Sequence, residues 1–325
     1  MYQSKLSIRQ TQSAIQDLKS FFQEKLKNEL NLTRATAPLF VSRKSGLNDT
    51  LNGEQPVNFS PKNNPEQLQI VHSLAKWKRQ ALHEYNFNVG EGLYTDMNAI
   101  RREEDLDDTH SYYVDQWDWE KIILEENRNI DYLKSTVNSI NKCVFETKEY
   151  INQKYNLTQK FNQEVYFISA QELEDLYPNL TPEQRENQLA KEKGTIFIYQ
   201  IGWNLNSGIP HSKRAFDYDD WSLNGDLIIY APWKNKAIEI SSMGIRVDKN
   251  SLLKQSKMNL EQVKQISKFH SDILNNILPL TIGGGIGQSR ISMLLLEKEH
   301  IGEVQSSYWP DEMKNELAQQ NIILL

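Results

Sequence analysis

A glycine-rich segment followed at once by an arginine constrains this chain more than any other feature. Residues 283–285 are consecutive glycines, Gly287 is a fourth, and Arg290 follows in what reads as the first turn of an apolar helix. Glycine lacks a Cβ, so a ligand can lie directly on such a strand. Arginine supplies a planar charged group that stacks on a base and reaches phosphate. The segment lacks the endings of a P-loop or a G-x-G-x-x-G turn. It therefore predicts either a nucleotide site of another kind or a glycine-rich turn that caps a buried helix.

Composition narrows the class of protein. The 325 residues are 25% charged and 38% hydrophobic with a net charge of −6, which argues against a broad nucleic-acid surface. No apolar run approaches the ~18 residues of a membrane span, and the single cysteine, Cys143, fits a reducing compartment. We therefore expect a cytoplasmic protein. The six histidines lie apart from one another and do not have zinc-site spacing.

Periodicity predicts one α+β domain over residues 1–325, built on an antiparallel sheet flanked by helices. Apolar residues recur at helical spacing in 13–30, in 74–85 and from Ile130 onward, and two helices are expected within 249–276. Leu32 to Val41 is predicted as a strand that Pro38 interrupts, because proline cannot donate to a ladder. Further strands are predicted at 68–72, 92–100, 111–119, 165–169, 195–199, 226–230 and 237–241.

The hairpin 226–241 suggests a metal site. If its turn is centred between residues 232 and 233, Asp226 and Glu239 face each other across the strands. Two opposed carboxylates repel unless a cation lies between them, and Mg²⁺ carrying ATP phosphates would serve. Alternatively, one acid points to solvent or pairs with Lys234 or Arg246.

Other polar residues carry two interpretations each. Arg101 ends a strand and either clamps a phosphate or forms a surface ion pair with Glu103 or Asp105. Gln116 and Asp118 share one strand face, which either holds a small zwitterion or is merely exposed; Trp117 and Trp119 would then face the core.

Two further features are equally open. Lys78 lies on a basic helix, and the ordinary interpretation of such a lysine is that it belongs to a solvent-exposed face. Residues 217–221, an acidic and aromatic loop, either hold an ammonium group or are solvated.

Taken together, these pieces resemble the catalytic core of class II aminoacyl-tRNA synthetases. The first helix with the strand near Pro38, the strand–loop–strand with Arg101 and the glycine strand with Arg290 are similar to the three motifs of that class, in order; Ser289 departs from the acid usual in the third. Longer stretches resemble the ammonia-dependent aspartate–ammonia ligases, the A-type asparagine synthetases: HSLAKWKR at 72–79, VDQWDWE at 114–120, DYDDW at 217–221 and SSMGIRV at 241–247.

The resemblance implies an ATP-dependent ligase that converts L-aspartate and ammonia to L-asparagine through β-aspartyl-AMP, with ATP as co-substrate and Mg²⁺. It also implies a homodimer that meets through the first helix and the strand near Pro38, with no anticodon-binding domain, tRNA or membrane. Catalytic roles fall to Arg101, Lys78 and Asp219. Aspartate would be bound by Asp49, Ser73, Gln116, Asp118, Tyr218, Ser241, Ser242 and Arg246. ATP would be bound by Arg101, Glu239, Gly285, Gly287 and Arg290, and the metal by Asp226 and Glu239.

Three rival functions remain to be distinguished. An aspartyl- or asparaginyl-tRNA synthetase would need a separate tRNA-binding module and a basic surface. A catalytically inactive nucleotide-binding relative would be expected to lose its arginines or metal acids, yet Arg101, Arg290, Asp226 and Glu239 are all present. A glutamine-dependent enzyme generally needs a nucleophilic cysteine, often N-terminal, whereas position 2 is Tyr2 and Cys143 falls inside a predicted helix.

Overall fold

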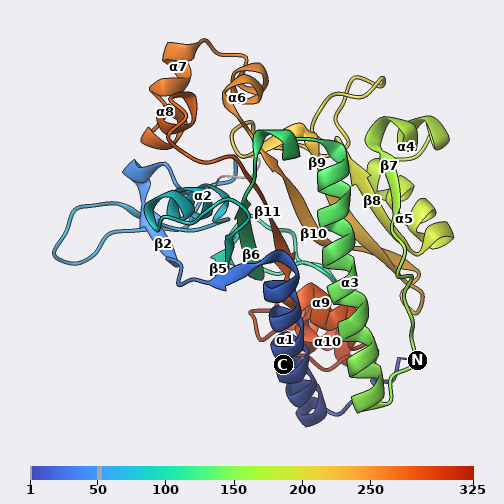
Figure 1. Ribbon diagram of the computed structural model, residues 1–325. Helices are drawn as coiled ribbons and strands as arrows, with labels where there is room; N and C mark the ends of the chain where they lie inside the picture. Colours follow the sequence, from blue (N-terminus) through green and yellow to red (C-terminus); the bar gives the residue numbers. More distant parts are fainter. Residues whose placement is uncertain (1, 50–52) are drawn as a thin grey trace.

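The computed structural model describes residues 2–49 and 53–325 (Figure 1). Within these residues, eight strands form one large sheet in the order β1-β5-β6-β11-β10-β9-β8-β7. Their bounds are β1 (Leu32–Arg34), β5 (Gly92–Ile100), β6 (Tyr113–Ile122), β7 (Tyr166–Ser169), β8 (Thr195–Tyr199), β9 (Asp219–Ala231), β10 (Lys236–Arg246) and β11 (Thr281–Gly287).

The two edges of this sheet correct the predicted architecture. β1 runs parallel to β5, and β7 runs parallel to β8, whereas the strands between them are antiparallel. Parallel neighbours need a long crossover connection. The chain supplies one between β1 and β5, and another, built from helices, between β7 and β8. The sheet is therefore mixed and mostly antiparallel, not purely antiparallel.

The single strand predicted for residues 32–41 is divided: its first residues form β1 of the large sheet, and its last residues enter a second sheet. β2 (Phe40–Ser42), β4 (Leu68–Ile70) and β3 (Asn58–Phe59) form a small antiparallel sheet in that order. Pro38 lies in the segment between β1 and β2, where the chain leaves the large sheet for the small one. The loop that joins β3 to β4 projects from the molecule (Figure 1).

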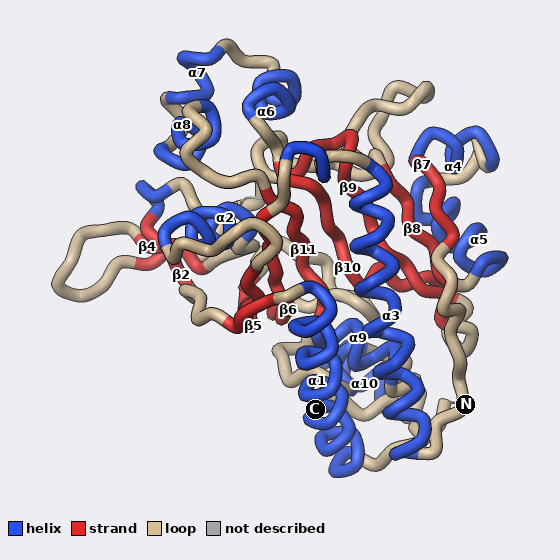
Figure 2. The backbone as a smooth tube through the Cα atoms, viewed as in Figure 1, coloured by secondary structure: helices blue, strands red, loops and turns tan. Residues whose placement is uncertain are grey.

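One face of the large sheet is covered by α1 (Ile8–Leu30), α3 (Ile130–Tyr155) and α9 (Gln288–Leu295). Figure 2 shows α1 and α3 running side by side. A capping box between Ser7 and Gln10 starts α1, and Leu18, Phe22 and Leu26 face the core at intervals of four residues. Trp117 and Trp119 enter this core from β6, as their alternation with Gln116 and Asp118 predicted.

The opposite face carries α2 (Ala75–Glu84), which packs against β5, β6 and β11, and α5 (Pro182–Lys193), which packs against β8, β9 and β10. A smaller apolar cluster that includes Leu189, Ile196 and Ile228 lies beneath α5 and α4 (Ala170–Leu176). Polar side chains occupy the remainder of this face.

Three short helices stand where two were predicted: α6 (Lys249–Ser256), α7 (Leu260–Lys264) and α8 (Lys268–Leu274). Lys257 takes a left-handed conformation after α6, and Asn259 caps the start of α7, so the chain is interrupted there. The last helix is α10 (Asp311–Gln319). In the described part of the chain, no helix is both long and apolar enough to cross a membrane.

Candidate active site

A cavity of about 350 Å³ opens on the polar face of the large sheet, which is within the size range of small-molecule sites. Its walls come from β6, β10 and β11, from the loop between β5 and β6, from the start of α2, and from the segment that precedes β9. Many of the predicted site residues line it. These are Ser73, Arg101, Gln116, Asp118, Tyr218, Asp219, Glu239, Ser242, Arg246, Gly285, Gly287 and Arg290.

The glycines of β11 make room for side chains of the neighbouring strand. A Cβ on Gly283 would overlap the carboxylate of Glu120, and one on Gly285 would overlap the amide of Gln116. Both partners belong to β6, which pairs with β11. Protein side chains therefore fill the space beside these two glycines, although Gly285 still lines the cavity. Gly287 differs: a Cβ there would first meet Arg290 at 3.3 Å.

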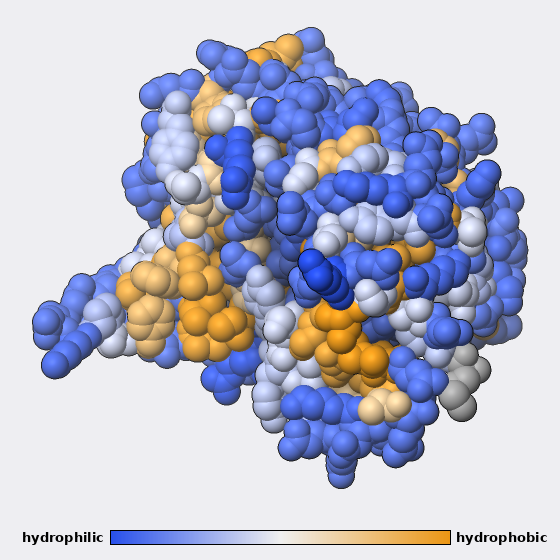
Figure 3. Space-filling view, turned by 90° about the horizontal axis from the view of Figure 1, so that it is seen from below, coloured by the Kyte–Doolittle hydropathy of each residue, from blue (hydrophilic) through white to orange (hydrophobic). Residues whose placement is uncertain are grey.

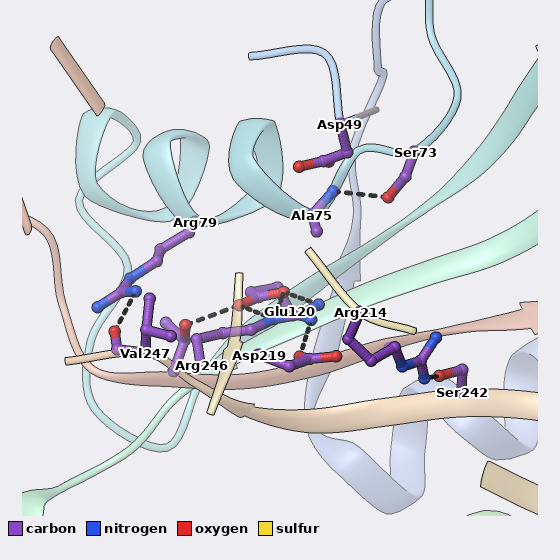
Figure 4. A network of polar contacts seen from close by, with 12 residues as sticks. Asp49, Ser73, Ala75, Arg79, Glu120, Arg214, Asp219, Ser242, Arg246 and Val247 are labelled. Carbon is purple, nitrogen blue, oxygen red and sulfur yellow. Dashed lines mark hydrogen bonds and ion pairs between the residues drawn. The ribbon is translucent and has the colours of Figure 1, made fainter. Parts of the chain in front are cut away.

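One end of the cavity holds a buried network of alternating charges (Figure 4). Arg246 donates from Nε and Nη2 to Glu120 at 3.0 and 2.8 Å, and from Nη1 to Asp219 at 2.5 Å. Burial alone would raise the pKa of Glu120, but Arg246 and Lys78 hold it below its ordinary value. This network keeps its charges in place without a ligand, which is the preorganisation that binding of a zwitterion requires.

Lys78 belongs to the same network. Its ammonium group pairs with Asp118 and donates to the carbonyl oxygens of Trp119 and Gly284 at 2.8 and 3.3 Å. The side chain is fully buried, so Lys78 does not lie on a solvent-exposed face of the helix. Lys78 itself does not line the cavity but fixes Asp118, which does.

Asp49 lies behind the cavity wall, close to Ser73 and the start of α2 (Figure 4). Lys76 lies between Asp49, at 3.7 Å, and Asp217, at 2.6 Å. Burial raises the pKa of Asp49 to about 6, against the opposing effect of Lys76. Asp217 also contacts His270 of α8 at 2.9 Å, so its neighbours tie the loop of Asp49 to two helices.

The other end of the cavity carries arginines. Arg290 donates to the main-chain carbonyl of Glu239 at 3.1 Å, and its Nη1 lies 3.5 Å from the Glu239 carboxylate. Among the described residues, the side chain of Arg101 has one ion pair, a long contact of 4.0 Å with Glu104, and it does not pair with the predicted Glu103 or Asp105. Burial lowers the pKa of Arg101, with Glu104 opposing. Both guanidinium groups therefore retain donors for an anion.

The register of the hairpin corrects the predicted acid pair. Glu239 pairs with Ile228, and Asp226 pairs with Ser242. The turn spans residues 232–235, so its centre lies one residue further along than the prediction assumed, and a bulge follows Glu239. The opposition of Asp226 and Glu239 is therefore wrong. The two acids still interact: burial raises the pKa of Asp226 most, and Glu239 raises it further. Asp226 pairs with Arg214 at 2.9 Å, and neither Lys234 nor Arg246 takes that place.

The remaining predictions are only partly met. Asp219 begins β9 and does not belong to a loop, because Arg246 of β10 pairs with it in the sheet. Asp226 lies outside the residues that line the cavity, and so does Ser241, whose hydroxyl donates to the carbonyl of Gly285 at 3.0 Å. Among the described residues, no group of three or more His, Cys, Asp or Glu side chains could hold a metal ion.

The sequence interpretation missed Glu120, Lys76 and Arg214. A signal for Glu120 was present, since it continues the alternation of Gln116 and Asp118 along β6. Lys76 stands two residues before Lys78 in the same helix. Arg214 has no such signal, because it reaches Asp226 and Ser242 from an irregular segment.

Comparisons with known proteins bear on this site. A family model described as aspartate-ammonia ligase matches residues 9–321. Proteins named aspartate–ammonia ligase from Bacillus cereus (strain G9842) and Bacillus thuringiensis (strain Al Hakam) are each 54% identical to the chain over 326 residues, covering 100% of both sequences.

Solved structures share the fold at low sequence identity. An Entamoeba histolytica asparaginyl-tRNA synthetase in complex with asparaginyl-adenylate superimposes with a TM-score of 0.68 at 13% identity, over 93% of this chain and 68% of that one. A Pyrococcus horikoshii asparaginyl-tRNA synthetase gives 0.66 at 16% identity, over 92% and 70%. The predicted class II synthetase core fold is thereby confirmed.

Proposed function

The chain belongs to the aspartate–ammonia ligase family, and we propose how its cavity forms L-asparagine from L-aspartate and ammonia with ATP. The observation that carries the proposal is the division of one cavity into two charged ends. One end holds Asp118, Asp219 and Arg246, and the other holds Arg101 and Arg290. An amino acid with two carboxylates fits the first end, and a nucleotide triphosphate fits the second.

Aspartate binding requires both signs of charge close together. Arg246 provides a cation for a substrate carboxylate, whereas Asp118 and Asp219 can accept from the substrate ammonium group. Ser73, Gln116, Tyr218 and Ser242 supply neutral donors on the cavity wall. Asp49 lies behind this pocket, where its loop would close over the bound substrate.

The first reaction step makes the β-carboxylate reactive. A β-carboxylate oxygen attacks the α-phosphorus of ATP, the bond from that phosphorus to the bridging oxygen breaks, and pyrophosphate leaves. Negative charge builds on the α-phosphate, where Arg101 would stabilise it. Arg290 would stack on adenine and hold the γ-phosphate. Gly287 would leave room for the nucleotide, and Gly285 would border it beside Gln116.

Ammonia completes the reaction. Its nitrogen attacks the β-carbonyl carbon, the bond to AMP breaks, and the nitrogen loses a proton to a nearby base, for which Asp219 is our candidate. Free ammonia is the expected nitrogen source. Cys143 is buried within α3, and burial raises the pKa of its thiol to about 12, so it is unsuited to attack glutamine.

The residues at the arginine end fit a magnesium ion that arrives with ATP. Mg²⁺ usually takes one or two protein carboxylates and fills its shell with water and phosphate oxygens, and Glu239 and Asp226 supply two interacting carboxylates. A bound magnesium ion would neutralise charge on the phosphates. Glu239 lines the cavity and is the primary ligand in this proposal, whereas Asp226 is the less accessible one.

Two further parts of the proposal concern partners. An apolar area lies beside the projecting loop (Figure 3), where Leu39, Phe40 and Phe59 are 49%, 44% and 39% exposed. Such an area favours a protein–protein contact, and we propose that two copies meet there and along α1. We expect no tRNA partner, and a cytoplasmic location stays a prediction.

The test is an assay of AMP and asparagine from aspartate, ATP and Mg²⁺, with ammonium or glutamine as nitrogen source. Ammonium should give both products in equal amounts, and glutamine should give neither. Arg101→Gln should lower formation of both by at least about a hundredfold, while the exposed neighbour variant Arg102→Gln should keep them. Release of ADP in place of AMP would refute the adenylation route.

A further inference from the structure

Arg214 covers Asp226 on the side of the cavity. Its Nη2 donates to Asp226 Oδ1 at 2.9 Å and also to the hydroxyl of Ser242 (Figure 4 shows the second contact). Arg214, Ser242 and Glu239 line the cavity, whereas Asp226 does not. Asp226 is only 8% exposed, so the guanidinium group occupies its accessible side.

The charges explain why an arginine lies there. Asp226 is a buried carboxylate, and a buried charge without a partner is costly. The guanidinium group of Arg214 supplies that partner at 2.9 Å. Arg214 is therefore the counter-ion of Asp226 in the ligand-free protein.

Asp226 and Glu239 are the proposed ligands of magnesium, so two cations compete for Asp226. A metal ion needs a lone pair of this carboxylate, and a guanidinium group at hydrogen-bond distance would repel a divalent cation. Either Asp226 never binds metal, or Arg214 leaves it when the metal arrives. The phosphates offer Arg214 an alternative partner, because Arg214 borders the cavity that would hold them. Arginine forms strong paired contacts with phosphate.

We propose that Arg214 is the resident counter-ion of Asp226 in the free enzyme and exchanges with the nucleotide-bound metal, turning its guanidinium group to the polyphosphate. This inference rests on the metal site given under the proposed function. The segment that carries Arg214 is irregular and precedes β9, so the exchange needs no rearrangement of the sheet. The site would thus be neutralised by the protein before ATP binds and by the metal afterwards.

The exchange predicts effects of opposite sign on two ligands. Mn²⁺ alone, followed by the electron paramagnetic resonance signal of the free ion, should bind nucleotide-free Arg214→Gln at least about fivefold more tightly than the unaltered enzyme. Mg-ATP, followed by calorimetry, should bind the same variant at least about fivefold more weakly, because the phosphates lose a partner. Arg214→Lys keeps the charge and should restore weak Mn²⁺ binding.

Matched variants make the test specific. Arg185→Gln removes another buried arginine, which pairs with Glu174 at 3.1 Å outside the cavity lining, and should change neither affinity. Arg214→Gln combined with Asp226→Asn should lose the gain in Mn²⁺ affinity. Circular dichroism verifies that each variant is folded.

Two results would overturn the exchange, and they differ in what they leave standing. If Arg214→Gln binds Mn²⁺ no more tightly while Asp226→Asn still weakens Mg-ATP binding, the metal site survives and the exchange is wrong. If Asp226→Asn has no effect on Mg-ATP either, Asp226 is not a metal ligand and the exchange falls with it. Asparagine formation, assayed separately, decides on the ligase mechanism itself.

Discussion

At the scale of single residues, the cavity owes its character to charges that the protein pairs before any substrate arrives. Arg246 lies between Glu120 and Asp219, and Lys78 lies between Asp118 and Glu120. Buried ion pairs are costly to form, and breaking one leaves an uncompensated charge. These buried pairs do not make the fold more stable than apolar residues would, so we infer that they serve the site.

Glu120 provides a direct check on this account. Glu120→Gln would leave Arg246 and Lys78 short of a buried negative charge, so the free energy of unfolding should fall by about 3 kcal/mol. Urea unfolding measures the change. Asp311→Asn, which removes a highly exposed partner of Lys314, should leave the unfolding curve nearly unchanged. Equal effects of the two substitutions would contradict the network.

Asp49 makes a prediction about pH. Its pKa rises on folding from 3.8 to about 6, so the folded protein holds this proton more tightly than the unfolded chain does. The stabilisation is complete below pH 3.8 and is lost as the pH rises through about 6, by on the order of 2–3 kcal/mol.

Urea unfolding between pH 4 and 7 tests this sign. Asp49→Asn should flatten the loss of stability across the window, because the amide cannot ionise. Glu164→Gln, at an exposed acid, should leave the slope as it is. A slope unchanged by Asp49→Asn would show that another group carries the titration.

At the scale of elements, regular alternation was predictable and long-range pairing was not. The period of two along β6 correctly separated Gln116 and Asp118 from Trp117 and Trp119, since strand geometry alone determines it. The hairpin register failed because a four-residue turn and a bulge both shift the pairing. The contact between Arg214 and Asp226 could not be predicted, because the residues around Arg214 show no periodic pattern and Asp226 lies in another element.

The glycines of β11 give the element-scale prediction. Gly283→Ala would drive a Cβ into Glu120 and toward Arg246, two side chains already held by their ion pair. The free energy of unfolding should fall by about 2–3 kcal/mol. Gly287→Ala, whose nearest neighbour is the flexible side chain of Arg290 at 3.3 Å, should cost clearly less in the same urea experiment. The reverse order would mean that β11 is shaped by a ligand and not by Glu120.

At the scale of the whole molecule, the sequence predicted the fold class but not how the sheet ends. Parallel pairs at both edges depend on crossovers, and the crossover that leads from β1 toward β5 carries the small sheet with its exposed Leu39, Phe40 and Phe59. The rings of Phe40 and Phe59 pack against each other with their centroids 5.2 Å apart, so the apolar area is continuous. A substitution in this apolar area therefore tests whether two copies of the chain associate there.

Analytical ultracentrifugation tests the proposed dimer. The unaltered protein should sediment at twice the mass of the 325-residue chain, and Phe40→Asp should shift it toward the single chain, since burying an unpaired charge opposes association. Ile209→Asp changes an apolar residue elsewhere that is more exposed than Phe40, at 59%, and should not shift the mass. A single-chain mass for the unaltered protein would contradict the dimer.

The most direct measurement of the central claim follows an oxygen atom. Aspartate labelled with ¹⁸O in its β-carboxylate is converted in the presence of ATP, Mg²⁺ and ammonium, and the products are analysed by mass spectrometry. Because the β-carboxylate attacks the α-phosphorus, the account predicts one labelled oxygen in each AMP and none in pyrophosphate. Unlabelled AMP, or label in the phosphate of another product, would contradict the adenylate route that the divided cavity supports.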